Sequence, residues 1–321
     1  MAKNQKLPYT VVRPLIGGLH QALLIPDDNA QKPLLLVVHG GPGEPMTPFI
    51  DTLSGLEARF VVCLWEQRGA AMSYSRLPDD IQVSQFVSDA IEVTQYLLKR
   101  FGREKLVLMG FSWGSLVGLL AAAQAPELYA MYIGVGQIAD QKASENDAYS
   151  EILDKSRAAG DEKSTACLLK IGPPPYLGQG AMKKMMQERT ILRKYSENPA
   201  GDVKLSTYFK KVLSCPYYRF SDKINYFRGM KSGAALFDEV LSIIVSETVP
   251  KVLVPIYVMQ GKHDMQTRPR YAEKLIYKLD APNKKYVQFE KAGHSVYDDD
   301  TDTFLHALDT IETIYDPWVR N

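Results

Sequence analysis

Short, uninterrupted apolar runs recur along this chain, and they restrict its possible folds more than any other feature. Leu34–Val38, Phe60–Trp65 and Lys105–Met109 are such runs, and they are typical of strands that are covered on both faces. Between the last two, apolar residues recur at steps of three and four from Val83 to Phe101, as on one face of an amphipathic helix. Strands that alternate with helices predict an α/β fold, with a mostly parallel sheet covered by helices.

The same alternation extends toward both ends of the chain. Near the start, Thr10–Ile16 and Leu19–Ile25 are β-rich, and Gly17-Gly18 between them suits a two-residue turn with positive φ. These residues predict an antiparallel pair. The later elements that the pattern predicts are a helix over Leu116–Ala123, strands over Tyr129–Val135, Ile256–Met259 and Tyr286–Phe289, and a last helix containing Phe304 and Leu308.

Residues 137–251 break this alternation, because they contain few β-rich runs, several helical segments and Pro173-Pro174-Pro175. We therefore expect a helical cap over 137–251, inserted between a first part of the core, 1–136, and a second part, 252–321. An aromatic patch in the cap either packs the cap against itself or forms the roof of a substrate pocket, and the sequence leaves both open. The patch comprises Tyr217, Tyr218, Phe220, Tyr226 and Phe227.

Charge and cysteine content restrict the classes of partner. The 321 residues carry 38 Lys and Arg against 37 Asp and Glu, so the net charge is +1 and we expect no nucleic-acid partner. Cys63, Cys167 and Cys215 are widely spaced, which argues against a disulfide framework or a metal site and favours a reducing compartment. The apolar stretches are too short to span a membrane, so we expect a cytoplasmic protein without membrane association. The oligomeric state stays open.

The segment Gly110-Phe111-Ser112-Trp113-Gly114 lies between a predicted strand and a predicted helix. Side chains flanking Ser112 would clash in so sharp a turn, so glycines are needed, and the strained turn holds the serine hydroxyl over the carboxyl edge of the sheet. This context predicts that Ser112 is a nucleophile. The alternative is a glycine-rich turn whose serine only caps the helix, although Ser115 could take that role.

A serine nucleophile needs a base, and the base needs a third group that fixes its tautomer. His294 is the best base among five histidines, because it follows the strand that ends near Phe289 and therefore lies at the same sheet edge as Ser112. Asp264, directly after the strand Ile256–Met259, is the expected acid, although an aspartate there also commonly caps a turn. Asp140 is the alternative acid.

The negative charge that develops on an attacked carbonyl oxygen needs preorganised donors. His39-Gly40-Gly41-Pro42-Gly43 follows the strand Leu34–Val38, where its glycines let backbone N–H groups face a substrate. We expect the N–H groups of Gly41 and Trp113 to form this oxyanion hole.

These motifs resemble the α/β-hydrolase family, and more narrowly its prolyl iminopeptidase-like branch. Further matching landmarks are Trp65-Glu66-Gln67-Arg68-Gly69, Gly261-x-x-Asp264 and Ala292-Gly293-His294-Ser295. The resemblance implies a mainly parallel eight-stranded sheet, a helical cap, no metal or organic cofactor, and hydrolysis through an acyl-enzyme.

Several positions depart from the branch. Glu66 and Ala71 replace a usual aspartate and glycine, and Glu44 after Gly43 brings a carboxylate toward the expected oxyanion hole. Prolyl iminopeptidases hold the ammonium of the substrate with glutamates, one typically beside a tryptophan, yet no tryptophan occurs between Trp113 and Trp318. The sequence does not choose among the available carboxylates, which are Glu44, Glu145, Glu151, Glu188, Glu197 and Glu239. For the substrate pocket, we expect Glu44, Phe111 and Tyr218 to contribute.

The expected function is therefore a serine hydrolase with Ser112, His294 and Asp264 as its catalytic residues. The expected substrate is a small molecule or short peptide, most simply one that loses an N-terminal proline or small apolar residue. Two alternatives stay open: a carboxylesterase or other carbonyl hydrolase, and a ligand sensor on a hydrolase scaffold.

Overall fold

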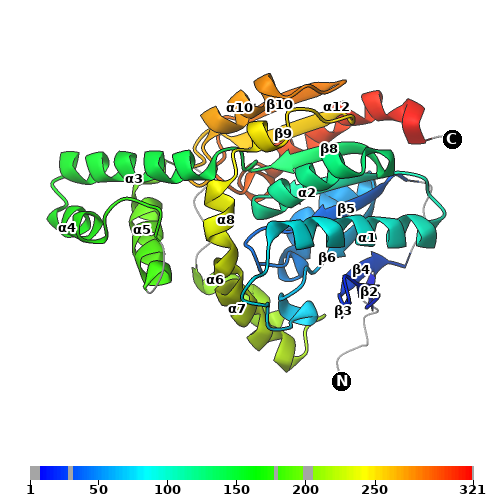
Figure 1. Cartoon of the computed structure of the whole chain (residues 1–321), viewed down its shortest axis with the longest axis horizontal. Helices are drawn as coiled ribbons and strands as arrows, with labels where there is room; N and C mark the ends of the chain where they lie inside the picture. Colours follow the sequence, from blue (N-terminus) through cyan, green and yellow to red (C-terminus); the bar gives the residue numbers. More distant parts are fainter. Residues whose placement is uncertain (1–7, 28–31, 177–179, 198–204, 320–321) are drawn as a thin grey trace.

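The computed structural model describes residues 8–27, 32–176, 180–197 and 205–319. An eight-stranded sheet forms its centre (Figure 1). In spatial order, the strands are β1 (Tyr9–Val12), β4 (Leu23–Pro26), β6 (Val61–Trp65), β5 (Leu34–Val38), β7 (Leu106–Phe111), β8 (Tyr129–Val135), β9 (Ile256–Gly261) and β10 (Lys284–Phe289). β4 is antiparallel to both of its neighbours, and all other neighbours are parallel. The predicted mostly parallel sheet is thus confirmed.

The N-terminal hairpin is divided into two antiparallel pairs. β1 pairs with β4 in the main sheet, whereas β2 (Leu15–Ile16) and β3 (Leu19–His20) form a separate two-stranded sheet. Gly17 and Gly18 turn between β2 and β3 with φ values of 52° and 77°. The sequence predicted one continuous strand on each side of this turn, which is longer than the strands observed. Pro14, between β1 and β2, has no N–H for a strand ladder, so the first strand is interrupted there.

Helices cover both faces of the sheet. They are α1 (Val83–Phe101), α2 (Trp113–Gln124), α10 (Pro269–Lys278), η1 (Thr47–Ala58) and α12 (Thr301–Val319), with the short η2 (Ala71–Ser73), η3 (Pro126–Leu128) and α11 (Val296–Asp299) in the connections. Leu34, Leu36 and Val38 of β5 share one core with α1, α2 and α10. Leu35 and Val37 face the opposite core, with η1 and α12. This period of two explains why the strand is apolar throughout.

The segment between β8 and β9 is mainly helical. It contains α3 (Gln141–Ala158), α4 (Glu162–Ile171), α5 (Ala181–Tyr195), α6 (Leu205–Ser214), α7 (Phe220–Gly233), η4 (Ala234–Leu236), α8 (Phe237–Ser242) and α9 (Val245–Thr248). α3, α4 and α5 form a lobe that projects from the rest of the molecule (Figure 1). Ala148, Ile152 and Leu168 belong to the separate core of this lobe. The predicted boundaries of the three units stay a prediction.

Besides the short helices in the connections, two longer helices that cover the sheet were absent from the sequence prediction. η1 contains Pro48 near its start and is a 3-10 helix, so its apolar residues do not follow the α-helical period. α10 buries only Ala272, Leu275 and Ile276, and its other positions are mostly charged or polar. Outside the insertion, for whose helices no bounds were predicted, α1 has its predicted bounds and α12 contains Phe304 and Leu308 as predicted. α2 starts earlier than predicted, at Trp113, directly after the serine.

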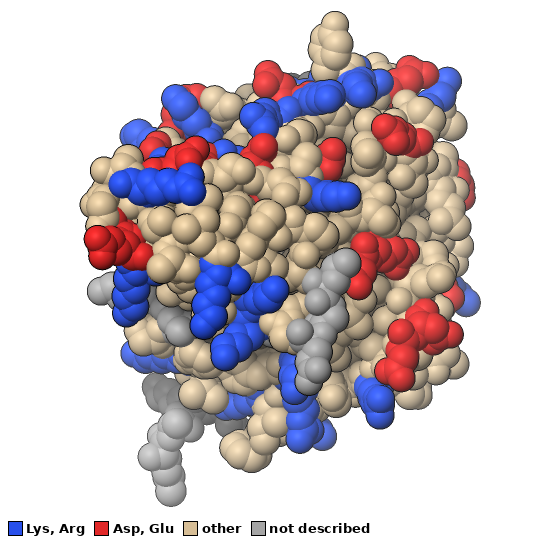
Figure 2. Space-filling view, turned by 60° about the vertical axis from the view of Figure 1, so that its left-hand side comes forward, with Lys and Arg blue, Asp and Glu red and all other residues tan. Residues whose placement is uncertain are grey.

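The surface carries side chains of both charges, which are interspersed on the face shown in Figure 2. No helix within the described residues is long and apolar enough to cross a bilayer. β10 forms one edge of the sheet, and its first residues, Lys284 and Lys285, are exposed. The cytoplasmic location stays a prediction.

Candidate active site

Ser112 occupies a strained turn between β7 and α2. Its φ of 51° and ψ of −117° lie outside the regions that residues with a side chain prefer. A Cβ atom at Gly110 would overlap the Gly114 carbonyl oxygen, and one at Gly114 would overlap the Val38 carbonyl oxygen. Both glycines are therefore required for α2 to start this close to β5 and β7.

The serine does not cap the helix that follows it. Ser112 is the N-cap residue of α2, yet its side chain makes no capping hydrogen bond. Ser115 Oγ instead donates to the Ser112 carbonyl oxygen at 2.5 Å and accepts from the Ile138 N–H at 2.9 Å. The Ser112 hydroxyl is thus left for another role.

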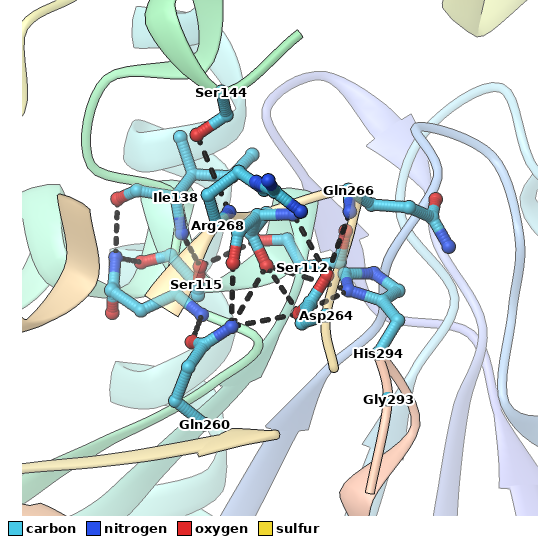
Figure 3. Close-up of polar contacts among 12 residues, drawn as sticks. Ser112, Ser115, Ile138, Ser144, Gln260, Asp264, Gln266, Arg268, Gly293 and His294 are labelled. Carbon is cyan, nitrogen blue, oxygen red and sulfur yellow. Dashed lines mark hydrogen bonds and ion pairs between the residues drawn. The ribbon is translucent and has the colours of Figure 1, made fainter. Parts of the chain in front are cut away.

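His294 and Asp264 meet at the carboxyl edge of the sheet (Figure 3). The His294 Nδ1 atom lies 2.8 Å from Asp264 Oδ2. Asp264 Oδ1 accepts from the backbone N–H groups of Gln266 at 2.8 Å and Thr267 at 2.9 Å. Its Oδ2 also accepts from Thr267 Oγ1 at 2.8 Å and from Gln260 Nε2 at 2.7 Å. The carboxylate is therefore fully buried yet fully hydrogen-bonded.

The end of β8 lies between Ser112 and His294. The Ser112 N–H donates to the Val135 carbonyl oxygen at 2.9 Å. The next residue, Gly136, has a φ of 59°, and a Cβ atom there would lie 3.1 Å from His294 Cε1. Ser112 and His294 therefore flank the same short segment, as their positions after parallel strands predict.

The pKa values of the pair move apart. Burial alone would lower the pKa of His294, but the charge and hydrogen bond of Asp264 outweigh burial and raise it above 6.5. Burial would likewise raise the pKa of Asp264, but the charge of His294 and the hydrogen bonds from His294 and Thr267 bring it below 3.8. The carboxylate is therefore ionised wherever the imidazole titrates.

The glycine loop after β5 lies against Ser112. A Cβ atom at Gly40 would lie 3.3 Å from Ser112 Cβ, so this position is tightly packed against the serine. Gly41 has a φ of 112°, which requires glycine. Trp113 is the first residue of α2, so its N–H has no acceptor within the helix.

A glutamine that the sequence analysis did not assign to the site links these two segments. Gln67 Oε1 accepts from Trp113 Nε1 at 2.8 Å, and Gln67 Nε2 donates to the His39 carbonyl oxygen at 2.8 Å. Burial lowers the pKa of His39 to about 4, so its ring is neutral near pH 7 and its Nε2 accepts from the Gln67 N–H at 3.1 Å. The only sequence signal for Gln67 was its place in the Trp65–Gly69 landmark.

The expected pocket residues differ in their surroundings. Glu44 is half-buried within electrostatic range of His294, and burial raises its pKa. Phe111 is buried, with its ring 4.9 Å from that of Tyr297 in an edge-on arrangement. Tyr218 is also buried, and its hydroxyl donates to Glu66 Oε1 at 2.7 Å.

The other carboxylates are mostly engaged in structural contacts. Glu151 pairs with Arg268, Glu145 with Arg189, and Glu197 with Lys155. Glu239 accepts from the Val83 N–H at 2.8 Å. Asp140, the alternative acid, accepts from the Ala143 N–H at 3.0 Å as the N-cap of α3.

Glu188 of α5 is different. It is fully buried, and neither of its carboxylate oxygens has a hydrogen-bond partner among the described residues. The Tyr176 hydroxyl, which donates to the Gly172 carbonyl oxygen at 3.0 Å, and the Arg189 side chain both lie within interaction range of this carboxylate. Burial raises the pKa of Glu188 to about 7, although Arg189 opposes the shift. The Glu188 carboxylate is thus buried beside Tyr176 and Arg189 without a hydrogen bond of normal geometry, which is rare for a buried acid.

Comparisons with known proteins agree with this architecture. A family model described as alpha/beta hydrolase fold matches residues 33–301. Probable aminopeptidase YbaC of Bacillus subtilis (strain 168) is 30% identical over 303 residues, which span 91% of this chain and 93% of that protein.

Two crystal structures share the fold at low sequence identity. Proline iminopeptidase of Mycobacterium smegmatis has a TM-score of 0.65 and 15% identity, over 96% of this chain and 98% of that one. The proline iminopeptidase-related protein of Thermus thermophilus has a TM-score of 0.63 and 20% identity, over 94% and 96%. With the sheet order and the family match, these likenesses place the chain in the α/β-hydrolase fold family.

Proposed function

We propose that the protein is a serine hydrolase in which Ser112 is the nucleophile, His294 the general base and Asp264 the residue that orients His294. The observation that carries this proposal is the 2.8 Å contact between His294 Nδ1 and Asp264 Oδ2, beside a serine held in a strained turn without a capping role. Fold alone would not suffice, because this fold also serves other functions.

The proposed reaction follows from which of these groups can accept and donate a proton. Neutral His294 accepts the Ser112 proton at Nε2 while Ser112 Oγ attacks the substrate carbonyl carbon. The N–H groups of Gly41 and Trp113 stabilise the negative oxygen. His294 then gives the proton to the leaving amine or alcohol, which leaves an acyl-enzyme. Water attacks the acyl carbon, His294 takes its proton and returns it to Ser112 Oγ, and the acid is released.

For the substrate, we propose a short peptide or aminoacyl amide with a free N-terminal amine on proline or a small apolar residue. Glu188 supports this proposal, because a substrate ammonium would supply the partner that its buried carboxylate lacks. Glu44 adds a second carboxyl group near His294. The aminopeptidase name of the relative with 30% identity supports the same substrate class.

Covalent labelling tests the serine hydrolase. A fluorophosphonate should form an adduct with the wild-type protein, and Ser112→Ala should abolish it while leaving the thermal unfolding midpoint within a few degrees. Absence of an adduct on the folded wild type would contradict the proposal and favour a ligand sensor.

Paired substrates test the requirement for an amine. Prolyl and alanyl arylamides should be cleaved, and their N-acylated forms should not. Glu188→Gln should raise KM for the free amines by about 10-fold or more, because it removes the charge that pairs with the ammonium. Glu162→Gln, an exposed position on α4 of the same lobe, is the control and should change neither kinetic constant. Equal cleavage of free and N-acylated substrates would instead indicate a carbonyl hydrolase without an amine requirement.

A further inference from the structure

A buried glutamine in β9 contacts the carboxylate that orients the proposed base. Gln260 has no exposed surface, and its Nε2 donates to Asp264 Oδ2 at 2.7 Å and to the Thr267 carbonyl oxygen at 2.6 Å. Its Oε1 accepts from the Gln137 N–H at 2.9 Å. Both amide hydrogens and the amide oxygen are thus used.

These partners permit one orientation of the amide. The reversed amide would place its oxygen against two acceptors, the Asp264 carboxylate and the Thr267 carbonyl, and its NH₂ group against the Gln137 N–H. Gln260 therefore presents a fixed donor to Asp264 Oδ2, the same oxygen that contacts His294 Nδ1.

The contacts of Gln260 continue to the proposed nucleophile by a route that does not involve His294. Gln137 precedes Ile138, whose N–H donates to Ser115 Oγ at 2.9 Å, and Ser115 Oγ donates to the Ser112 carbonyl oxygen at 2.5 Å. Figure 3 shows Gln260, Asp264, Ile138, Ser115 and Ser112 in one hydrogen-bonded group. These contacts join the acid loop, which is the segment after β9 that contains Asp264, to the turn after β7 that contains Ser112. The connection runs through Gln137 and Ile138, which follow β8.

We propose that Gln260 is a positioning residue, which holds the Asp264 carboxylate aimed at His294 and fixes the acid loop relative to the Ser112 turn. This inference rests on the proposed serine hydrolase function and adds to it a residue that does not touch the substrate. Three donors share Asp264 Oδ2, so Gln260 also withdraws charge from the oxygen that attracts the His294 proton. Without Gln260, Asp264 would attract that proton more strongly.

Gln260→Met tests the role, because it keeps the length of the side chain and removes its polar atoms. We expect fluorophosphonate labelling at pH 7 to slow about 10-fold, as befits a lost hydrogen bond to a charged group. The acidic limb of the pH–rate profile should move to higher pH, because the stronger attraction of Asp264 keeps His294 protonated up to a higher pH. In arylamide turnover, kcat should fall while KM stays within about twofold, since Gln260 acts after binding.

Gln260→Glu provides a conservative rescue. A protonated carboxyl can donate to Asp264 Oδ2 and accept from the Gln137 N–H, whereas an ionised one repels Asp264. The labelling rate of this variant, relative to Gln260→Met, should therefore be highest at low pH and decline as pH rises. A merely structural role would give a constant ratio.

Gln21→Met is the matched control. Gln21 is also fully buried, donates to the buried Asp89 at 2.6 Å and accepts from Trp65 Nε1 at 2.9 Å, but it takes no part in the contacts around Asp264. Gln21→Met should lower thermal stability without changing the pH dependence of fluorophosphonate labelling. If Gln260→Met does not fold, Thr267→Val removes another donor to the same oxygen and should move the acidic limb in the same direction.

The outcomes separate the two proposals. No labelling of the wild type would contradict the serine hydrolase itself. Normal labelling of the wild type together with an unshifted profile in the folded Gln260 or Thr267 variants would overturn the positioning role and leave the hydrolase proposal standing.

Discussion

Ser112 holds a backbone conformation that costs about 1–3 kcal/mol for a residue with a side chain. The structure tolerates this cost because β7 and α2 are fixed on both sides of the turn by buried contacts. Val38, at the end of β5, fits directly against Gly114. The position of the serine hydroxyl thus depends on the absence of a Cβ atom two residues away.

Gly114→Ala should therefore destabilise the fold. The added Cβ atom would overlap the backbone oxygen of Val38, which cannot move without disturbing β5. We expect a loss of several kcal/mol in the free energy of unfolding, measured by urea denaturation. Gln124→Ala, at the exposed end of the same helix, is the control and should change the free energy of unfolding little. Equal losses in both variants would contradict this account.

The raised pKa of His294 predicts the pH dependence of activity. Only the neutral imidazole accepts the Ser112 proton, so the rate should rise with pH through a value above 6.5. Asp264→Asn removes the charge that raises this pKa and leaves burial, which lowers it. The variant should lose about 10³–10⁴-fold in kcat, and its residual activity should begin at lower pH than in the wild type. A pH–rate profile of both proteins checks the direction of the shift.

Among the elements, Glu66 joins the helical insertion to the core. Its carboxylate, directly after β6, accepts from Thr47 Oγ1 at 2.5 Å, from the Met72 N–H at 2.7 Å and from the Tyr218 hydroxyl at 2.7 Å. Thr47 belongs to η1, Met72 to η2, and Tyr218 lies between α6 and α7. Three segments of the chain thus depend on one buried acid.

At pH 8, where Glu66 is mostly ionised, Tyr218→Phe should lower the free energy of unfolding by about 1.5–3 kcal/mol, because a buried charged group loses a donor. Tyr257→Phe is the matched control, since the Tyr257 side chain is fully buried and its hydroxyl has no hydrogen-bond partner among the described residues. Its removal should be neutral or slightly stabilising. Chemical denaturation of both variants gives the comparison. A larger loss of stability for Tyr257→Phe than for Tyr218→Phe would contradict the role of the Tyr218 hydroxyl as a donor to Glu66.

The accuracy of the sequence predictions varied with the kind of signal. β5, β8 and α1 have their predicted bounds, because short β-rich apolar runs indicate buried strands and apolar residues at steps of three and four indicate an amphipathic helix. His294 and Asp264 were predicted to lie at one sheet edge, and the structure brings them into contact. Gln260 and Gln67 could not be predicted, because a glutamine in or beside a strand has no periodic signal and its partners lie far away in sequence.

At the scale of the whole molecule, two buried glutamates make stability depend on pH. Burial raises the pKa of both Glu66 and Glu188 from 4.5 to about 7. Between these values the folded protein holds protons that the unfolded chain has released, so the free energy of unfolding should fall as pH rises from about 4.5 to about 7. Asp264 acts oppositely: its lowered pKa adds stability above about 3.8, which is lost in stronger acid.

Urea unfolding at pH 5 and pH 8 measures this dependence. Each glutamate should contribute up to about 3 kcal/mol to the difference, so Glu66→Gln and Glu188→Gln should each reduce it. Glu162→Gln, at an exposed site, should leave the difference unchanged. The lowered pKa of His39 acts in the opposite direction up to about pH 6.5, so the test is the change between variant and wild type. A difference that stays the same in both glutamine variants would contradict the prediction.

The lysines at the start of β10 affect whether copies of the protein associate through the edges of their sheets. An outermost strand offers unpaired backbone groups to which a second molecule could add a strand and so begin a fibre. Lys284 and Lys285 put positive charge at that edge of the sheet, so the same edges of two molecules repel each other. Repulsion between these lysines therefore opposes the addition of a strand from a second copy at this edge.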